Sequence, residues 1–282
     1  MNFTLRELLN STWQLFISRL ALAWAVVFAG IIPILLLGVL LLGFGFGGGL
    51  MGSLGSMAPP GGGYSGGISP ALAGVLAGGA LAMLVFLVVL VFVMPYCLGG
   101  LNGTAVDALG AGDGFSVWRF FNHGFKLYGR SLAFFLLALV LVVAMVIVDA
   151  IVGFVLHFIL AWLVVPWVVA VYLAFACFSF YWLPAVYLGT GGQIKALRDA
   201  FRVTFPEGKW KQAIGFILVC VLAEVVLWLV ATVLDITVIG LIIGVPLMIV
   251  GPIFLYTFFI LGAFNAYSAG GSPAEVPAIT TG

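Results

Sequence analysis

Long uninterrupted runs of apolar residues alternate with short mixed segments along the whole chain. Six runs are long enough to cross the roughly 30 Å hydrocarbon core of a bilayer, which takes about 20 helical residues. They lie near Leu20–Leu42, Ala71–Met94, Ser131–Leu156, Trp162–Leu188, Gln212–Leu234 and Val238–Tyr267. Because the apolar residues are continuous rather than alternating, the pattern predicts helices and not the strands of a barrel. We therefore expect an all-α membrane protein with six transmembrane helices.

Mixed segments precede the first, third and fifth apolar runs. They read "TLRELLNSTWQLFISR" (4–19), "FSVWRFFNHGFKLYGR" (115–130) and "QIKALRDAFRVTF" (193–205). Each segment places apolar and aromatic residues on one face of a helix and basic residues on the others. Thr4 and Glu7 have the spacing of a capping box at the start of the first. The pattern predicts three amphipathic helices that lie in the headgroup layer of the membrane.

The same unit therefore occurs three times: an interfacial helix, a span and a return span. We expect residues 1–268 to form one membrane domain and residues 269–282 to form a short cytoplasmic tail. The segment 43–70, between the first two spans, is rich in glycine and carries no charge. Its composition favours a flexible extracytoplasmic linker. The alternative is a loop that is ordered by a partner or by folding over the outer face.

The charges are few and unevenly placed. The chain is 65% hydrophobic and 7% charged, with a net charge of +1, which argues against a nucleic-acid partner. With six spans, the amino terminus and the two connections 95–130 and 189–211 fall on one side of the membrane and hold two, three and five of the ten Lys and Arg residues. The opposite connections hold none. This distribution predicts that both termini are cytoplasmic.

Basic residues at the membrane boundary are candidates for contact with lipid phosphates, and membrane lipids are therefore the expected partners. These candidates are Arg19, Arg130, Lys195, Arg198, Arg202, Lys209 and Lys211.

Two carboxylates lie within the predicted spans. Glu224 follows Lys211 by about 20 Å of helix, and Asp149 follows Arg130 by about 28 Å. One hypothesis is a proton or cation site formed by Glu224 and Asp149. The other is that Glu224 is protonated, or bonded to a neighbouring hydroxyl, and only helps to hold the helices together. Pro33, Pro166, Pro246 and Pro252 predict kinks in the apolar helices.

No catalytic motif is present in the sequence. There is no GxSxG, HExxH or P-loop pattern, and Cys97, Cys177 and Cys220 are far apart. We therefore expect no enzymatic activity, no metal and no cofactor.

The segments "LRELLNSTWQLFISRLALAWAVVFAGIIP", "GFKLYGRSLAFFLL" and "IKALRDAFRV" resemble a group of uncharacterised six-span prokaryotic membrane proteins. They are also similar to the membrane domain that precedes the catalytic domain of some bacterial glycerophosphodiester phosphodiesterases. The resemblance covers roughly residues 3–268 and implies a six-helix domain in a prokaryotic plasma membrane. It carries no functional residue over to this chain.

These observations favour a non-enzymatic membrane protein that serves as an accessory or scaffold subunit of a membrane complex, or that organises lipid. The alternative is a carrier or channel for a lipid or small solute that uses Glu224 and the kinked helices. Another integral membrane protein is a possible partner in the first case.

Overall fold

The computed structural model describes residues 4–56, 80, 83–110, 115–189, 191–235 and 238–270. These residues form helices joined by short connections, and they contain no strand. The helices are α1 (Leu5–Ser18), α2 (Leu22–Ser56), η1 (Val89–Val93), α4 (Met94–Leu109), α5 (Val117–Lys126), α6 (Tyr128–Leu160), η2 (Ala161–Leu163), α7 (Val164–Leu188), α8 (Gln193–Thr204), α9 (Trp210–Asp235) and α10 (Val238–Gly270).

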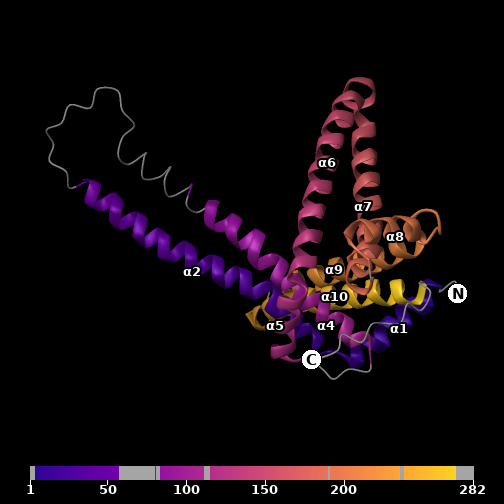
Figure 1. Ribbon diagram of the computed structural model, residues 1–282, viewed down its shortest axis with the longest axis horizontal. Helices are drawn as coiled ribbons and strands as arrows, with labels where there is room; N and C mark the ends of the chain where they lie inside the picture. Colours follow the sequence, from indigo (N-terminus) through magenta and orange to yellow (C-terminus); the bar gives the residue numbers. More distant parts are fainter. Residues whose placement is uncertain are drawn as a thin grey trace.

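The order of the helices confirms the predicted architecture. A short amphipathic helix (α1, α5 or α8) is followed by a long helical hairpin, three times in succession (Figure 1). Within the described residues, six helices are long and apolar enough to cross a membrane, at Leu22–Val39, Met83–Leu109, Tyr128–His157, Val164–Leu188, Trp210–Leu234 and Ile242–Ala269. The protein is an all-α membrane protein with six transmembrane helices.

The three repeats pack in a cycle. The return helices α4, α7 and α10 contact one another. Each short helix packs on the return helix of the hairpin before it, α5 on α4 and α8 on α7, and α1 closes the cycle on α10. The outgoing helices follow the same rule, because α6 contacts α4, α9 contacts α7 and α2 contacts α10. The beginning and the end of the described chain therefore share one interface.

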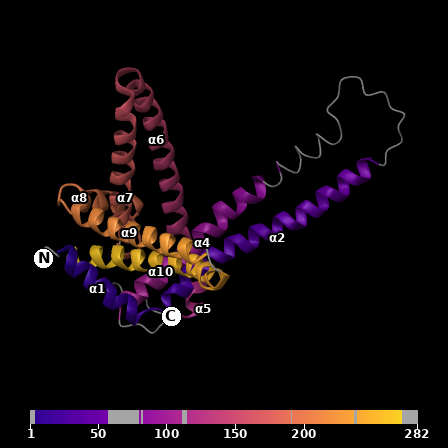
Figure 2. The ribbon, with the colours of Figure 1, turned by 180° about the vertical axis from the view of Figure 1, so that it is seen from behind.

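The hairpins meet at one end and diverge beyond it. Figures 1 and 2 show the α6–α7 hairpin and α2 extending in different directions from the end that holds α1, α5 and α8, where the pair α9–α10 also lies. We refer to this shared end as the junction. Its core contains large buried side chains from the inner ends of the long helices, including Phe180, Tyr181, Trp182, Phe216 and Phe264.

Away from the junction, the long helices bury little. In the most apolar stretches of α6 and of α9 only 6% of the residues are buried, against 39% in the most apolar stretch of the span Met83–Leu109. Ile34 of α2, Phe154 of α6 and Ile242 of α10 are each at least 66% exposed. The outer halves of the hairpins therefore present apolar side chains to whatever surrounds the protein in the membrane.

The second span is longer than predicted. The sequence pattern placed residues 95–130 in a connection, but α4 continues to Leu109 and carries its glycines in the junction. The five-residue π-helical turn η1 lies directly before Pro95. Such a turn accommodates a proline because it relaxes the hydrogen-bond ladder where the ring would meet the preceding carbonyl.

The Gly-rich segment also begins differently from the prediction. Helix α2 continues through it to Ser56, so the first half of the predicted linker is helical. In hydrocarbon every backbone group must find a partner within the chain, which favours helix even where glycine would oppose it in water. Residues 57–70 of the predicted linker and 271–282 of the predicted tail lie outside the described residues.

The prolines predicted to kink helices fall into two groups. Pro33 lies inside α2, and Pro246 and Pro252 lie inside α10. Pro166 instead lies in the first turn of α7, where the backbone N–H has no partner in the helix and proline is tolerated.

Candidate functional site

The basic residues gather at the junction. All ten Lys and Arg residues lie on α1, α5 or α8, in the connections beside them, or in the first turns of α6 and α9. The outer parts of the hairpins carry none. A single cationic end is the arrangement expected of a membrane protein whose positive residues stay on one side of the bilayer.

Two of the candidate phosphate contacts bind the protein itself. Arg19 donates from Nη2 to the carbonyl of Gly110, which follows α4, at 3.1 Å. Arg130 donates from Nη1 to the carbonyls of Tyr187 and Gly189 at the end of α7, each at 3.5 Å. Both arginines thus satisfy carbonyls at the ends of return helices, where a cation is also favoured by the helix dipole.

Three more candidates lie around the connection between α8 and α9. Arg202 and Lys209 flank the carboxylate of Glu207, with nitrogen–oxygen distances of 3.4 Å and 3.6 Å. The ammonium of Lys211 lies 5.6 Å from the centre of the Trp210 ring, in cation–π geometry.

Lys195 and Arg198 differ from the other candidates. Both are exposed on α8, and neither forms a hydrogen bond or ion pair with a residue that the structure describes. Their charges are therefore free to meet an anion from outside the chain.

Beside Arg198 the surface is hollowed into an open groove of about 680 Å³. Its walls come from α6, α7 and α8, and apart from Arg198 they consist of apolar side chains. The lining residues are Leu141, Ala144, Met145, Val148, Val171, Ala174, Phe175, Phe178, Ile194, Leu197, Arg198, Phe201 and Phe205. A long apolar surface with a cation at its edge suits an amphiphile whose head is anionic.

The structure does not join the two predicted intramembrane carboxylates. Asp149 accepts a hydrogen bond from the indole N–H of Trp167 at 3.1 Å, across the α6–α7 hairpin. Glu224 is exposed on α9 and lines a surface hollow formed by residues of α9 alone. Neither an ion pair nor a hydrogen bond connects these residues, so no common site forms around them in the described part of the chain.

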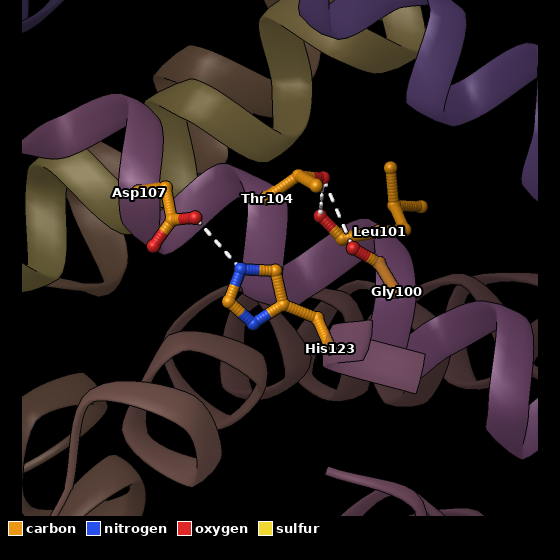
Figure 3. A network of polar contacts seen from close by, with 5 residues as sticks. All are labelled: Gly100, Leu101, Thr104, Asp107 and His123. Atoms are coloured by element: carbon orange, nitrogen blue, oxygen red, sulfur yellow. Dashed lines mark hydrogen bonds and ion pairs between the residues drawn. The ribbon is translucent and has the colours of Figure 1, made fainter. Parts of the chain in front are cut away.

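A buried polar pair that is not among the candidates predicted from the sequence lies between α4 and α5. His123 is 6% exposed, and its Nε2 lies 2.7 Å from Oδ2 of Asp107, to which the ring donates (Figure 3). Thr104, one turn before Asp107, donates to the carbonyls of Gly100 and Leu101 of its own helix. The pair fastens the second repeat's short helix to the first repeat's return helix.

Further polar contacts lie within the second repeat and between the other repeats. The hydroxyls of Ser131 and Tyr187 lie 2.8 Å apart, which links α6 to α7. Gln193, the first residue of α8, donates to the carbonyl of Arg130 at 2.8 Å. Asn265 of α10 donates to Ser11 of α1 at 2.8 Å.

A short recurring motif could have revealed part of this network. "LGGLN" (98–102) in α4 and "LGAFN" (261–265) in α10 carry the same Leu-Gly-x-x-Asn pattern. In both, the asparagine amide makes a hydrogen bond, Asn102 to the carbonyl of Leu98 and Asn265 to Ser11. In both, the glycine allows close approach, because a Cβ at Gly99 or Gly262 would meet a side chain of another helix.

Comparison of the chain with protein-family models, with curated proteins and with solved structures finds no match. The resemblance to six-span prokaryotic membrane proteins and to the phosphodiesterase membrane domain therefore stays a prediction.

Proposed function

We propose that this protein is a non-enzymatic protein of a prokaryotic plasma membrane that organises the lipid or protein around it, as an accessory or scaffold subunit. The observation that carries the proposal is the confinement of the core to the junction. Beyond the junction the diverging hairpins leave apolar side chains exposed, and lipid or another membrane protein must cover them.

The short helices support the same proposal. In α8 the buried residues are small, namely Ala196, Ala200 and Thr204, whereas Ile194 is 74% exposed. In α5, Trp118 and Phe125 are 79% and 76% exposed. Large apolar side chains that face outward beside basic residues suit helices that lie in a headgroup layer. With the cationic junction on the cytoplasmic side, both termini are cytoplasmic in this proposal.

Native mass spectrometry of the protein extracted in mild detergent tests this function. We expect the protein to be released with a stoichiometric protein partner or with several retained phospholipids. A monodisperse monomer that is released without partner and without lipid would contradict the proposal.

The carrier alternative makes a separate prediction. The hollow at Glu224 is lined by one helix rather than by several, which gives no support to a passage through the protein. If Glu224 nevertheless serves transport, Glu224→Gln should abolish uptake by proteoliposomes of a solute that the wild-type protein carries. A Glu224→Gln variant that differs from the wild type only in stability would remove this alternative.

A further inference from the structure

The groove between the α6–α7 hairpin and α8 has two walls that are each formed by one face of a helix. Leu141, Ala144, Met145 and Val148 lie at positions i, i+3, i+4 and i+7 along α6. Val171, Ala174, Phe175 and Phe178 repeat that spacing along α7. Both stripes therefore run lengthwise along the hairpin, for about 10 Å each at 1.5 Å per residue. The groove extends outward from the junction.

The third wall is the apolar face of α8. Ile194, Leu197, Phe201 and Phe205 line the groove, although Ile194 is 74% and Phe201 55% exposed. This helix crosses beside the inner part of α7, so its apolar face meets the inner end of the groove (Figures 1 and 2). Apolar side chains of this size at a membrane surface need a cover, and acyl chains of the surrounding lipid can provide it.

The charges at the inner end of the groove are positive. Arg198 lines the groove, and Lys195 lies one helical turn before it on the same side of α8. Neither makes a hydrogen bond or ion pair with a described residue. The acidic residue of α8, Asp199, lies one turn after Lys195 but forms no ion pair with either cation among the described residues. The groove therefore offers a long apolar trough with two available cations at the end that lies in the headgroup layer.

We infer that this groove binds one anionic phospholipid from the same leaflet as α8. Its phosphate lies against Arg198 and Lys195, and an acyl chain follows the crease between α6 and α7. The guanidinium suits a phosphate because its N–H groups donate in a planar fork. The inference rests on the proposed function, since it names the lipid class that the protein would organise.

Titration of the full-length protein with phosphatidylglycerol tests the inference. The protein would be held in nanodiscs of phosphatidylcholine, and bound phosphatidylglycerol would be counted by native mass spectrometry. Removing one cation near a membrane surface costs about fivefold in affinity for an anionic lipid, so we expect this loss for Arg198→Gln and a larger one for Lys195→Gln with Arg198→Gln. Lys211→Gln is the matched control, because this lysine lies over Trp210 and outside the groove.

A second variant separates the apolar groove from the cations. Ala174 is exposed in the groove, so Ala174→Trp fills the trough without entering the core and leaves Arg198 and Lys195 in place. We expect it to lower the occupancy by phosphatidylglycerol about as much as Arg198→Gln does. Circular dichroism and size-exclusion chromatography verify that each variant remains folded.

Several outcomes would overturn the inference. One is an affinity for phosphatidylglycerol that is unchanged in Arg198→Gln. Another is an equal loss of affinity in Lys211→Gln, which would indicate a general charge effect. A third is an occupancy by phosphatidylglycerol that Ala174→Trp leaves unchanged. A fourth is full displacement of the lipid by inorganic phosphate. Either result would indicate a phosphate site without a place for the acyl chain. If the wild-type protein retains lipid but no variant alters it, only this inference fails. If the wild-type protein is released bare, the proposed function fails first.

Discussion

At the scale of single residues, the contact between α4 and α5 depends on glycine. A Cβ placed on Gly103 would lie 2.6 Å from the Cβ of His123, closer than side-chain atoms pack. The Cβ is the first atom of the His123 side chain, so it cannot move aside unless the backbone of α5 moves as well. Gly103 is thus a close-approach position of the kind that lets membrane helices pack tightly.

The same glycine-to-alanine substitution at two positions tests this contact. Gly103→Ala should destabilise the protein by about 1–3 kcal/mol, because the methyl group overpacks the interface. Gly129→Ala adds the same group at a position in α6 with nothing within 4 Å, and it should leave stability unchanged or raise it. Thermal unfolding in detergent compares the two. Equal midpoints for both variants would show that α4 and α5 do not approach as described.

Asp107 should matter through the histidine that it faces. In Asp107→Ala the ring of His123 stays buried without its partner at 2.7 Å, which costs about 1–3 kcal/mol of stability. Asp107→Asn keeps an acceptor oxygen and should lose less. Denaturation of both variants measures the difference, and an alanine variant as stable as the asparagine variant would refute the role of the pair.

The sequence predicted the location of a single residue only where the chemistry of its side chain restricts that location. Lysine and arginine are costly in hydrocarbon, so their positions along the chain predicted one cationic end, and the structure places all ten there. The partner of His123 could not be found in this way. Asp107 lies 16 residues earlier on another helix, and their meeting depends on how far α4 extends and how α5 is rotated against it.

At the scale of elements, the three short helices show which faces pattern can identify. The spacing predicted an apolar face on each helix, and the structure confirms the helices. In α8, however, the protein-facing side is the small-residue side, with Ala196 and Ala200, while Ile194 and Phe201 face outward. In a membrane, large apolar side chains gain as much from lipid as from protein, so packing selects small residues instead.

The capping box of α1 gives a pH-dependent prediction. Hydrogen bonds from the backbone N–H and the hydroxyl of Thr4 hold the pKa of Glu7 below its ordinary value of 4.5. Because the pKa is lowered in the folded state, this stabilisation is complete above about pH 4.5 and is lost as the pH falls through the lowered value.

Amide hydrogen exchange of the first turn of α1 measures this effect. In the wild-type protein, protection factors should stay constant above about pH 4.5 and should fall below it as the carboxylate takes up its proton. Thr4→Ala should lower protection already at the higher pH, by about 1 kcal/mol for a lost cap, and should show a smaller pH dependence. Protection in the wild-type protein that does not change with pH would contradict the box.

Glycine limited what the sequence could predict about element boundaries. Glycine-rich segments usually interrupt helices in water-soluble proteins. The segments "CLGGLNG" (97–103) and "GFGFGGG" (43–49) are nevertheless helical. In α4 the glycines serve close packing against α5, and this purpose is visible only once Phe120 and His123 are opposite them.

At the scale of the whole molecule, the cyclic packing explains why the core is small and where it lies. The short helices, the inner ends of the outgoing helices and the return helices all meet at the junction. The threefold unit was predictable from the spacing of apolar runs and amphipathic segments. The divergence of the hairpins was not, because an outer half that faces lipid and one that faces protein have the same apolar composition.

The three hairpins thus share one core at the junction and separate beyond it. The collision rate of oxygen with nitroxide labels tests this arrangement. The labels are placed singly on α6 at Val142, Ile147 and Val148, which lie on different sides of the helix, in the purified protein in nanodiscs. These side chains are 37%, 54% and 49% exposed, so all three labels should collide with oxygen as often as a label in lipid does. Rates as low as that of a label at the buried Ala185 would show a closed six-helix bundle and contradict the account.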